Sequence, residues 1–314
     1  MSDEFERIAR LKQRFQSLRG HGIVLGIGDD AAVLSGSENC VLSVDTAVES
    51  VHFEREFAPL QVLAARAFSA ALSDLAAMAA SPCAALCSLV LPAELGEAEF
   101  DAIIEGLAIA AANYDCPIVG GNLAAGRELS LTTTVIGRLQ GSGLLRSGAH
   151  AGDRICVTGS LGSAALGLLL LQRGAAALGP EAVGRWRTPR ARIREGLQLR
   201  GIASAAIDVS DGALQDLGHL CEASELGAEI RVADLPLESG FSELARELGH
   251  DPLRLALLGG EDYELIYTVP ESSPVLGPGH CIGRMTYDTG KLKVLDEQGR
   301  ELRLEGRGYG HFRK

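Results

Sequence analysis

Segments with a strand-like pattern alternate with segments of helical spacing along the whole chain, and this alternation constrains the fold more than any other feature. In the first half, two Ala-rich segments, at 60–80 and 99–114, have the composition and spacing of helices. Alternating or β-branched patterns predict strands over 40–48, 85–92, 117–121 and 129–139. Strands separated by helices are typical of β-α-β units, so the sequence predicts a mixed α/β fold.

A polar, glycine-containing stretch at 140–153 interrupts this pattern, and a similar alternation starts again after it. The chain has 314 residues, which is long enough for two domains of roughly 150 residues each. We therefore expect an N-terminal α/β domain at 1–147 and a C-terminal α/β domain at 148–314.

In the second half, a strand is expected from Arg154 and a helix over 163–173. The uncharged stretch that covers both is long enough to raise the question of a membrane span, but its glycine turn favours a strand, a turn and a helix. Residues 207–227 are expected to form a loop that enters a helix ending at Gly227. Residues 255–269 are expected to form a glycine turn followed by a strand.

The chain carries a formal charge of −12, and only 4% of its residues are aromatic. The negative field repels polyanions and few rings are available to stack on bases, so nucleic acid is not an expected partner. The seven cysteines have no metal-binding or paired spacing, which favours a reducing, cytoplasmic location. Apolar residues at helical spacing over 1–15 predict an amphipathic helix and not a signal peptide, so no membrane association is expected.

Carboxylates beside glycine, serine or threonine are the most unusual local feature of the sequence. They lie in five short segments, GIGDDAA (26–32), SVDT (43–46), LSD (72–74), IDVSDG (207–212) and GGEDYE (259–264). Any one of these segments can be explained as a helix N-cap or an Asx-turn. Brought together, however, the carboxylates would repel one another without cations. Hard oxygen ligands suit Mg²⁺, and Mg²⁺ in turn indicates a phosphate substrate.

The familiar nucleotide and hydrolase motifs are missing from the sequence. It contains no P-loop, and Gly26-x-Gly28 leads into Asp29 and Asp30, which would repel a dinucleotide pyrophosphate. It also contains neither the H-E-x-x-H motif of zinc proteases nor the G-x-S-x-G motif of serine hydrolases. These mechanisms are therefore not expected.

The acidic segments, together with VHF (51–53), GGN (120–122), RSGAHAGD (146–153) and GYGHF (308–312), resemble the motifs of thiamine-monophosphate kinases, in the same order over nearly the whole chain. The resemblance implies a two-domain aminoimidazole ribonucleotide synthetase-like α/β fold with an N-terminal sheet that forms a homodimer. It also implies ATP-dependent phosphorylation of thiamine monophosphate to thiamine diphosphate by direct in-line transfer, with several Mg²⁺ ions.

The same resemblance implies roles for individual residues. The implied metal ligands are Asp30, Ser43, Asp45, Asp74, Asn122, Asp208 and Asp211, of which Asp45, Asp74 and Asp211 are central to catalysis. The implied ATP contacts are Tyr114, Gly121, Asn122, Arg146 and Ser210. Thiamine monophosphate is expected to contact His52, Glu261 and Phe312, since a carboxylate and an aromatic face suit a cationic thiazolium.

Plainer explanations stay open for several of these residues. Asn122 can be a turn-forming residue after two glycines, and Arg146 a solvated charge in the junction. Tyr114 can be a packing residue at the end of a helix. His52 can be a hydrogen-bonded turn histidine, and Phe312 a core residue.

One position departs from the family pattern. Ser163 stands where relatives carry Asp, but Ser is also a good N-cap residue, so the helix is still expected to begin there. Two other functions also stay open. The first is an enzyme of the same superfamily acting on a different anionic acceptor, and the second is a non-catalytic nucleotide-binding relative.

Overall fold

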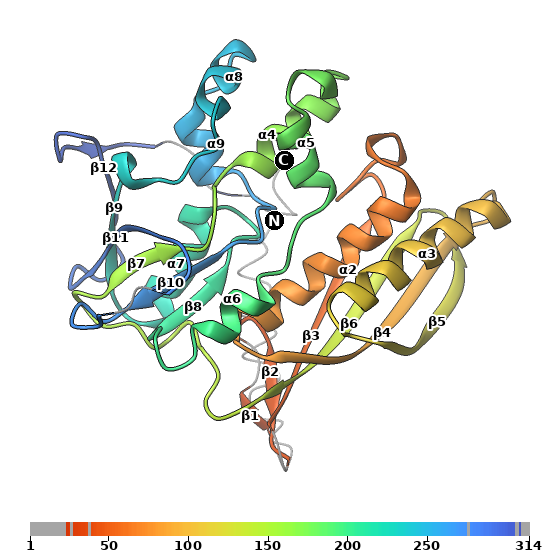
Figure 1. Ribbon diagram of the computed structural model, residues 1–314, viewed down its shortest axis with the longest axis horizontal. Helices are drawn as coiled ribbons and strands as arrows, with labels where there is room; N and C mark the ends of the chain where they lie inside the picture. The colour runs from red at the N-terminus through yellow and green to blue at the C-terminus, as the bar shows by residue number, and fades with distance from the viewer. Residues whose placement is uncertain (1–22, 26–27, 37–38, 275–276, 305–307, 309–314) are drawn as a thin grey trace, which may run out of the picture.

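The computed structural model describes residues 23–25, 28–36, 39–274, 277–304 and 308, and in these residues the chain forms two β-sheets with helices packed on them (Figure 1). The first sheet is built from the first half of the chain and the second sheet from the second half. The mixed α/β prediction is therefore confirmed. The helix predicted over 1–15 and the candidate Phe312 lie outside the described residues.

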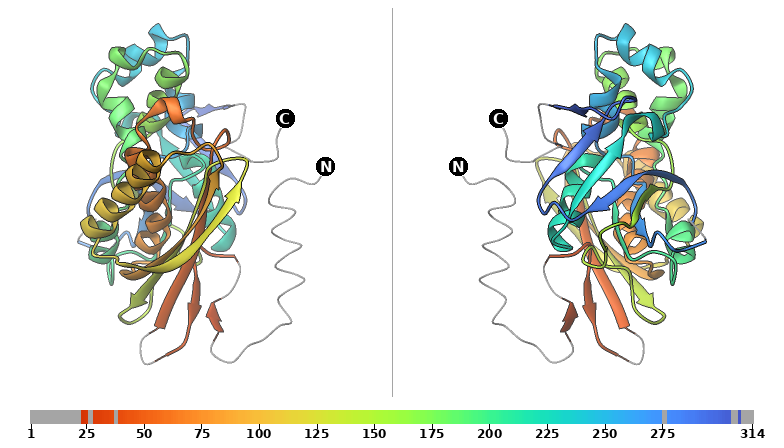
Figure 2. Two further views of the ribbon diagram at one scale, coloured as in Figure 1. Left: turned by 90° about the vertical axis from the view of Figure 1, so that its right-hand side faces the viewer. Right: turned by 90° about the vertical axis from the view of Figure 1, so that its left-hand side faces the viewer.

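The first sheet has six strands in the order β1-β2-β3-β6-β4-β5. Their bounds are Ile23–Leu25, Ala32–Leu34, Asn39–Val48, Ser81–Pro92, Ile118–Gly126 and Ser130–Leu139 for β1 to β6. Strands β4 and β5 are parallel neighbours joined through helix α3 (Glu97–Asn113), which is the predicted β-α-β unit. Helices α2 (Leu60–Ala77) and α3 cover one face of the sheet, as Figure 2 shows.

Strand β5 is longer than predicted and continues to Gly126. The strand was expected to end at 121 because two glycines and an asparagine follow one another there. However, β4 offers a parallel partner along the whole length, so Gly121 and Asn122 lie inside the strand and not in a turn. A Cβ on Gly121 would lie 1.7 Å from the carbonyl oxygen of Cys87, so the pairing itself requires glycine at this position.

The second sheet has seven strands in the order β13-β12-β9-β11-β7-β10-β8. Their bounds are Arg154–Val157, Ala205–Asp208, Gly227–Arg231, Leu265–Val269, His280–Thr286, Leu292–Leu295 and Glu301–Leu302 for β7 to β13. The helices of this half are α4 (Ser163–Gln172), α5 (Pro180–Arg187), α6 (Ile193–Gln198), α7 (Ala213–Ala223), α8 (Phe241–Glu247) and α9 (Pro252–Leu258). Short 3₁₀ turns lie at Arg55–Phe57, Ala176–Leu178 and Val232–Asp234. The uncharged stretch after Arg154 is thus a strand, a turn and a helix, as predicted.

Two helix ends differ from the prediction. Helix α7 ends at Ala223 and not at Gly227, because Glu225 adopts a positive φ of 57° and the N–H of Leu226 bonds back to the carbonyl of Cys221. Gly227 instead begins β9, where a Cβ would lie 2.3 Å from the carbonyl oxygen of Asp288.

Helix α4 begins at Ser163 as expected, but it is capped differently. Its N-cap residue is Gly162 and not Ser163, whose Oγ is buried without a hydrogen-bond partner among the described residues. The N–H groups of Gly162 and Ala164 donate to the carboxylate of Asp262 at 2.6 and 3.1 Å. A side chain from about one hundred residues further along therefore caps this helix, which no local sequence pattern indicates.

Helix α2 is the element that the two halves share. Most of its side chains are buried, and it contacts β3, β6 and β4 on one side and α6 and β8 on the other. Ala76 and Ala77 at its end pack in one cluster with Leu199 and Tyr267 of the second half. Among the described helices, α2 alone is long and apolar enough to cross a membrane, but 72% of that span is buried inside the protein. Its apolar composition is accounted for by this burial.

We expect Gly106→Ala to destabilise the protein by about 1–3 kcal/mol, the usual range for overpacking. Gly106 lies on α3 against α2, where a Cβ would come within 2.0 Å of the carbonyl oxygen of Gln61. The matched control is Gly218→Ala on α7, where a Cβ would meet nothing within 4 Å. There the higher helix propensity of alanine is expected to increase the free energy of unfolding by about 0.5–1 kcal/mol. Urea unfolding measures the free energy of unfolding of both variants. Equal changes in the two variants would contradict the close contact of α2 and α3.

Candidate active site

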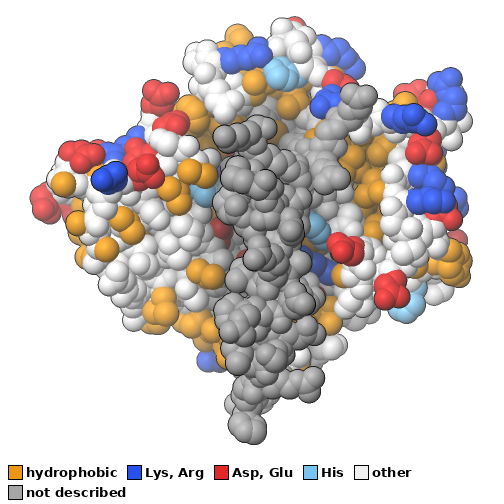
Figure 3. All heavy atoms as spheres, turned by 180° about the vertical axis from the view of Figure 1, so that it is seen from behind, with side chains coloured by type: hydrophobic (Ala, Val, Ile, Leu, Met, Phe, Trp, Pro, Cys, Tyr) orange, Lys and Arg blue, Asp and Glu red, His pale blue; other side chains and the backbone are white. Residues whose placement is uncertain are grey.

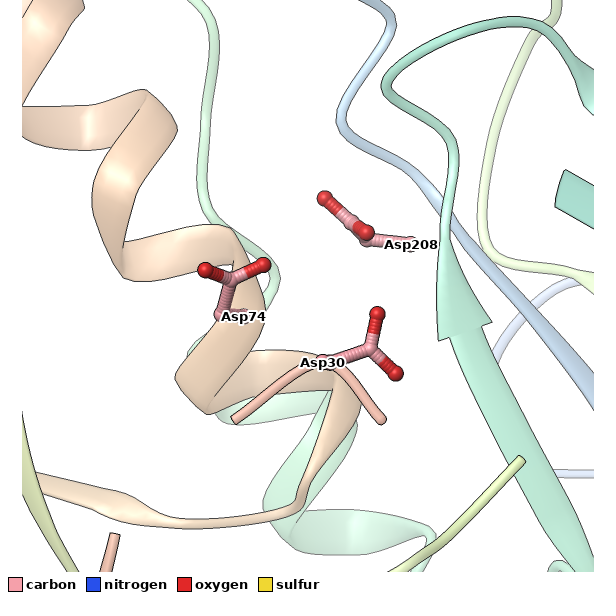
Figure 4. A group of neighbouring side chains, drawn as sticks. All are labelled: Asp30, Asp74 and Asp208. Atoms are coloured by element: carbon pink, nitrogen blue, oxygen red, sulfur yellow. The ribbon is translucent and has the colours of Figure 1, made fainter. Parts of the chain in front are cut away.

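Three carboxylates from distant parts of the chain point toward one another, as Figure 4 shows. Asp30 lies in the loop before β2, Asp74 lies on the last turn of α2, and Asp208 is the last residue of β8. One oxygen of each lies within 4.8 Å of the others, which is close enough for a shared metal ion. The sequence predicted all three as ligands, and the structure brings them together.

In this acidic cluster Asp30 and Asp208 are buried and Asp74 is half-buried, and the cluster carries more negative charge than its protein partners balance. Burial, followed by the charge of Asp30, raises the pKa of Asp208 to about 7. Burial and then the charge of Asp208 raise the pKa of Asp74 well above its ordinary value. Carboxylates in such surroundings ionise readily only when a cation joins them, so the donor set fits a divalent metal ion.

Arg146 is the cation that the chain itself supplies to this cluster. Its Nε and Nη2 donate to the two oxygens of Asp30 at 3.0 and 2.6 Å, and its backbone N–H donates to Asp29. A bidentate pair of this kind balances one of the three charges and fixes the direction of the guanidinium. The plainer explanation of Arg146 as a solvated linker charge is therefore wrong, because its side chain is only 23% exposed and ion-paired.

Strand β3 carries the next two candidates. The hydroxyl of Ser43 donates to the carboxylate of Asp74, so Ser43 lies directly beside the cluster. Asp45 is two residues further on the same face but is exposed, and its Oδ1 accepts the N–H of Thr46 at 2.7 Å. Its charge nevertheless contributes to the raised pKa of Asp74, after burial and nearer acids, so it lies within electrostatic reach of the cluster.

The loop between β8 and α7 carries Ser210 and Asp211 and is shaped by a residue that sequence reasoning missed. One oxygen of Asp216 accepts the backbone N–H groups of Ser210, Asp211 and Gly212, each at 3.1 Å. Asp211 in turn accepts a hydrogen bond from Gln215 at 2.9 Å. The signal for Asp216 was an acid in the first turn of a helix, which is common enough to pass unnoticed.

Glu261 lies apart from the acidic cluster, in the loop between α9 and β10, and its charge is balanced within the protein. Its carboxylate pairs with Arg66 on α2 and accepts the indole N–H of Trp186 on α5 at 2.8 Å. Burial opposes the charged form of Arg66, but the charge of Glu261 raises the pKa of that arginine above its ordinary value. Neither Arg66 nor Trp186 was singled out from the sequence, because both look like ordinary helix residues there.

The other candidates are spread around these two groups. Gly121 and Asn122 lie on β5 and line a mainly apolar groove of about 760 Å³ between α3, β4 and β5. The hydroxyl of Tyr114 accepts the N–H of Ala191 at 2.9 Å and so ties α3 to the second half of the chain. The Nδ1 of His52 accepts the N–H of Val48 at 3.1 Å, which directs a proton to Nε2.

Comparison with known proteins identifies the family. The chain is 40% identical to the thiamine-monophosphate kinase of Escherichia coli K12, over 98% of each chain, and 32% identical to that of Bacillus subtilis, over 99% of this chain and all of the other. It belongs to the thiamine-monophosphate kinase family. Residues 28–139 also match the family model of the AIR synthase related protein N-terminal domain.

Solved structures agree with this assignment. A structure described as AaThiL complexed with AMPPCP and TMP matches 99% of this chain and 97% of its own with a TM-score of 0.87 and 30% identity. The thiamine monophosphate kinase of Aquifex aeolicus matches with a TM-score of 0.82 and 29% identity. The hydrogenase maturation protein HypE matches with a TM-score of 0.70 at 21% identity, which shows a shared fold. The predicted synthetase-like architecture is thus confirmed.

We expect millimolar Mg²⁺ to raise the melting temperature of the protein. A ligand that binds only the folded state increases the free energy of unfolding by about 2.7 kcal/mol when its concentration is a hundred times its Kd. In Asp208→Asn the shift is expected to disappear, while the melting temperature in EDTA is not reduced, since one buried like charge has been removed. Asp101→Asn, at an exposed acid on α3, is the matched control and retains the shift. Differential scanning calorimetry checks this, and an undiminished shift in Asp208→Asn would contradict the ligand assignment.

Proposed function

We propose that the protein transfers the γ-phosphoryl group of ATP to the phosphate of thiamine monophosphate, giving thiamine diphosphate and ADP. The observation that carries this proposal is the buried cluster of Asp30, Asp74 and Asp208 in a chain that aligns over 98% of its length with named thiamine-monophosphate kinases. Its structural relative complexed with AMPPCP, an analogue of ATP, and TMP supports the same pair of substrates. Both reactants are anionic, so the reaction needs charge neutralisation and alignment more than it needs a base.

Several Mg²⁺ ions are the expected cofactors, and when bound they would neutralise the phosphates of both substrates. The residues proposed to hold them are Asp30, Ser43, Asp45, Asp74, Asn122, Asp208 and Asp211. The oxygens of the acidic cluster face one another, and the hydroxyl of Ser43 orients Asp74 by donating to it. Asp45 and Asp211 add negative charge at the edges of the cluster, which supports a site for more than one cation. We propose Asp45, Asp74 and Asp211 as the carboxylates on which turnover depends.

ATP is proposed to contact Gly121 and Asn122 on β5, Tyr114 at the end of α3, and Arg146 and Ser210 near the acidic cluster. The guanidinium of Arg146 already points at the cluster through its pair with Asp30, which supports a role in orienting a phosphate beside the metal ligands. The loop that carries Ser210 is held by Asp216, so its hydroxyl is presented on a rigid turn.

Thiamine monophosphate is proposed to contact His52, Glu261 and Phe312. The Nδ1 of His52 accepts the N–H of Val48, which makes Nε2 the N–H donor of the ring, and the side chain of Glu261 is 24% exposed. His52 lies in the turn that follows β3, the strand that carries Ser43 and Asp45, and the N–H of Glu261 donates to the carbonyl of Ser210 at 2.8 Å.

The purified protein is expected to form thiamine diphosphate from ATP, Mg²⁺ and thiamine monophosphate, with no product in EDTA and none from free thiamine. Asp211→Asn is expected to reduce kcat by a factor of about 100 or more, because it removes charge near the transferred group without changing volume. Chromatography of the thiamine phosphates measures the product. If the protein binds nucleotide but does not phosphorylate thiamine monophosphate, the proposed substrate is wrong and a different anionic acceptor is favoured.

We also propose that the protein forms a homodimer through the outer face and free edge of the first sheet. Strand β5 is an edge strand among those described, and its residues 119–125 are all exposed. Next to it, Val44 on β3 and Leu86 on β4 are 61% and 40% exposed on the face that lies away from α2 and α3. Figure 3 shows hydrophobic side chains among the polar ones on this side of the molecule. A long exposed edge with apolar neighbours favours pairing with a second copy.

Leu86→Glu is expected to shift the protein from dimer to monomer, because it would bury a charge in the proposed interface. Ile109→Glu on α3 is the matched control, since Ile109 is 41% exposed, compared with 40% for Leu86, and lies on the opposite side of the sheet. Light scattering after size-exclusion chromatography gives the mass of each. A wild-type monomer, or a dimer that survives Leu86→Glu but not Ile109→Glu, would contradict the proposed face.

The two-domain division and the cytoplasmic location remain proposals. The first sheet ends at Leu139 and the second begins at Arg154, which supports a boundary near residue 147. All seven cysteines are free thiols in the structure, four of them buried, which supports a reducing compartment.

A further inference from the structure

Both oxygens of the Glu261 carboxylate are engaged by side chains from two other parts of the chain. Arg66 on α2 donates from Nη2 to Oε1, and Trp186 on α5 donates from Nε1 to Oε2 at 2.8 Å. The carboxylate therefore already has a counter-charge and a defined orientation before any substrate is present. This differs from the expectation that Glu261 offers an unbalanced negative charge to a cationic thiazolium.

Arg66 and Trp186 also hold each other. The Nε of Arg66 donates to the carbonyl oxygen of Trp186 at 2.8 Å, and its guanidinium lies 4.3 Å from the centre of the Trp186 ring. Phe57 packs edge-on against the same ring with centroids 5.7 Å apart. Arg66 is 4% exposed and Trp186 is fully buried, whereas the Glu261 side chain is 24% exposed. Two buried side chains thus present one partly exposed carboxylate.

The backbone around Glu261 is held as firmly as its side chain. Glu261 and Tyr263 both have positive φ angles, 67° and 50°, a conformation that is strained in a residue other than glycine. Their N–H groups donate to the carbonyls of Ser210 and Val209, both at 2.8 Å. The loop is therefore fastened to the residues that follow Asp208, and the orientation of Glu261 is linked to the position of the acidic cluster.

We propose that Arg66 is a positioning residue for substrate recognition: with Trp186, it holds Glu261 as an oriented, charge-balanced acceptor for an N–H donor of the substrate. This inference rests on the proposed function. Each carboxylate oxygen can accept more than one hydrogen bond, so Glu261 keeps acceptor capacity on its exposed side. In thiamine monophosphate the N–H donor is the amino group of the aminopyrimidine. Recognition at Glu261 therefore selects for this amino group and not for the positive charge of the thiazolium.

A double-mutant cycle tests whether Arg66 acts through Glu261. Arg66→Met and Glu261→Gln are each expected to raise the KM for thiamine monophosphate about tenfold while the KM for ATP stays within about twofold. The double variant is expected to be no worse than Glu261→Gln alone, because Arg66 acts on the substrate only through the carboxylate of Glu261. A double variant whose KM equals the product of the two single effects would overturn the inference, and so would an equal rise in both KM values.

Arg192→Met is the matched control. Arg192 forms a similar bidentate pair with buried Glu264 but does not touch Glu261. It is expected to lower the melting temperature as Arg66→Met does, yet to leave the KM for thiamine monophosphate within about twofold. If Arg66→Met does not fold, Trp186→Phe tests the same positioning of Glu261, since it removes the N–H donor to Glu261 and keeps a smaller aromatic ring.

A substrate analogue distinguishes hydrogen bonding from charge. Thiamine monophosphate with the amino group replaced by hydrogen keeps the thiazolium charge, so wild-type protein is expected to bind it about tenfold more weakly than the natural substrate. Glu261→Ala, which has no side-chain acceptor, is expected to bind both alike. Equal binding of the two by wild-type protein would overturn the role assigned to Glu261. Wild-type protein that turns over no thiamine monophosphate would instead refute the proposed function itself.

Discussion

The packing of helix α2 between the two halves of the chain is the constraint on which the rest of the structure depends. Its small side chains let it lie against the first sheet on one side and against α6 and β8 on the other. The same helix carries Arg66 and Asp74, which are eight residues and therefore about 12 Å apart along its axis. One buried helix thus sets the spacing between the side chain that holds Glu261 and the carboxylate of the acidic cluster.

Charge is distributed differently at these two places. Glu261 is balanced within the protein by Arg66, so its orientation is part of the folded structure. The cluster of Asp30, Asp74 and Asp208 has one protein cation, Arg146, among the described residues, and the pKa values of Asp74 and Asp208 are raised by burial and by the neighbouring carboxylates. Such a site costs stability in the folded protein until cations bind, which couples the stability of the cluster to ligand binding.

Local patterns predicted about half of the helices and strands that the structure describes, and not all of their ends. The β-branched strand at 129–139 was predicted correctly because every second side chain in it is buried, and the Ala-rich helices because alanine strongly favours a helix. The length of β5, the end of α7 and the cap of α4 were not. The length of β5 and the cap of α4 depend on distant partners, which are strand β4 and the carboxylate of Asp262. Helix α7 ends early because of the turn at Glu225.

By itself, the sequence determined which residues are chemically able to form the site and to which family the chain belongs, because motif identity and order survive in the linear chain. It could not determine that Asp30, Asp74 and Asp208 meet within 4.8 Å while Asp45 stays exposed. Nor could it determine that Arg66 and Trp186 engage Glu261, since these three residues lie up to 195 positions apart. Only tertiary packing decides which charges share a buried space, because electrostatic interactions depend on distance and burial and not on separation along the chain.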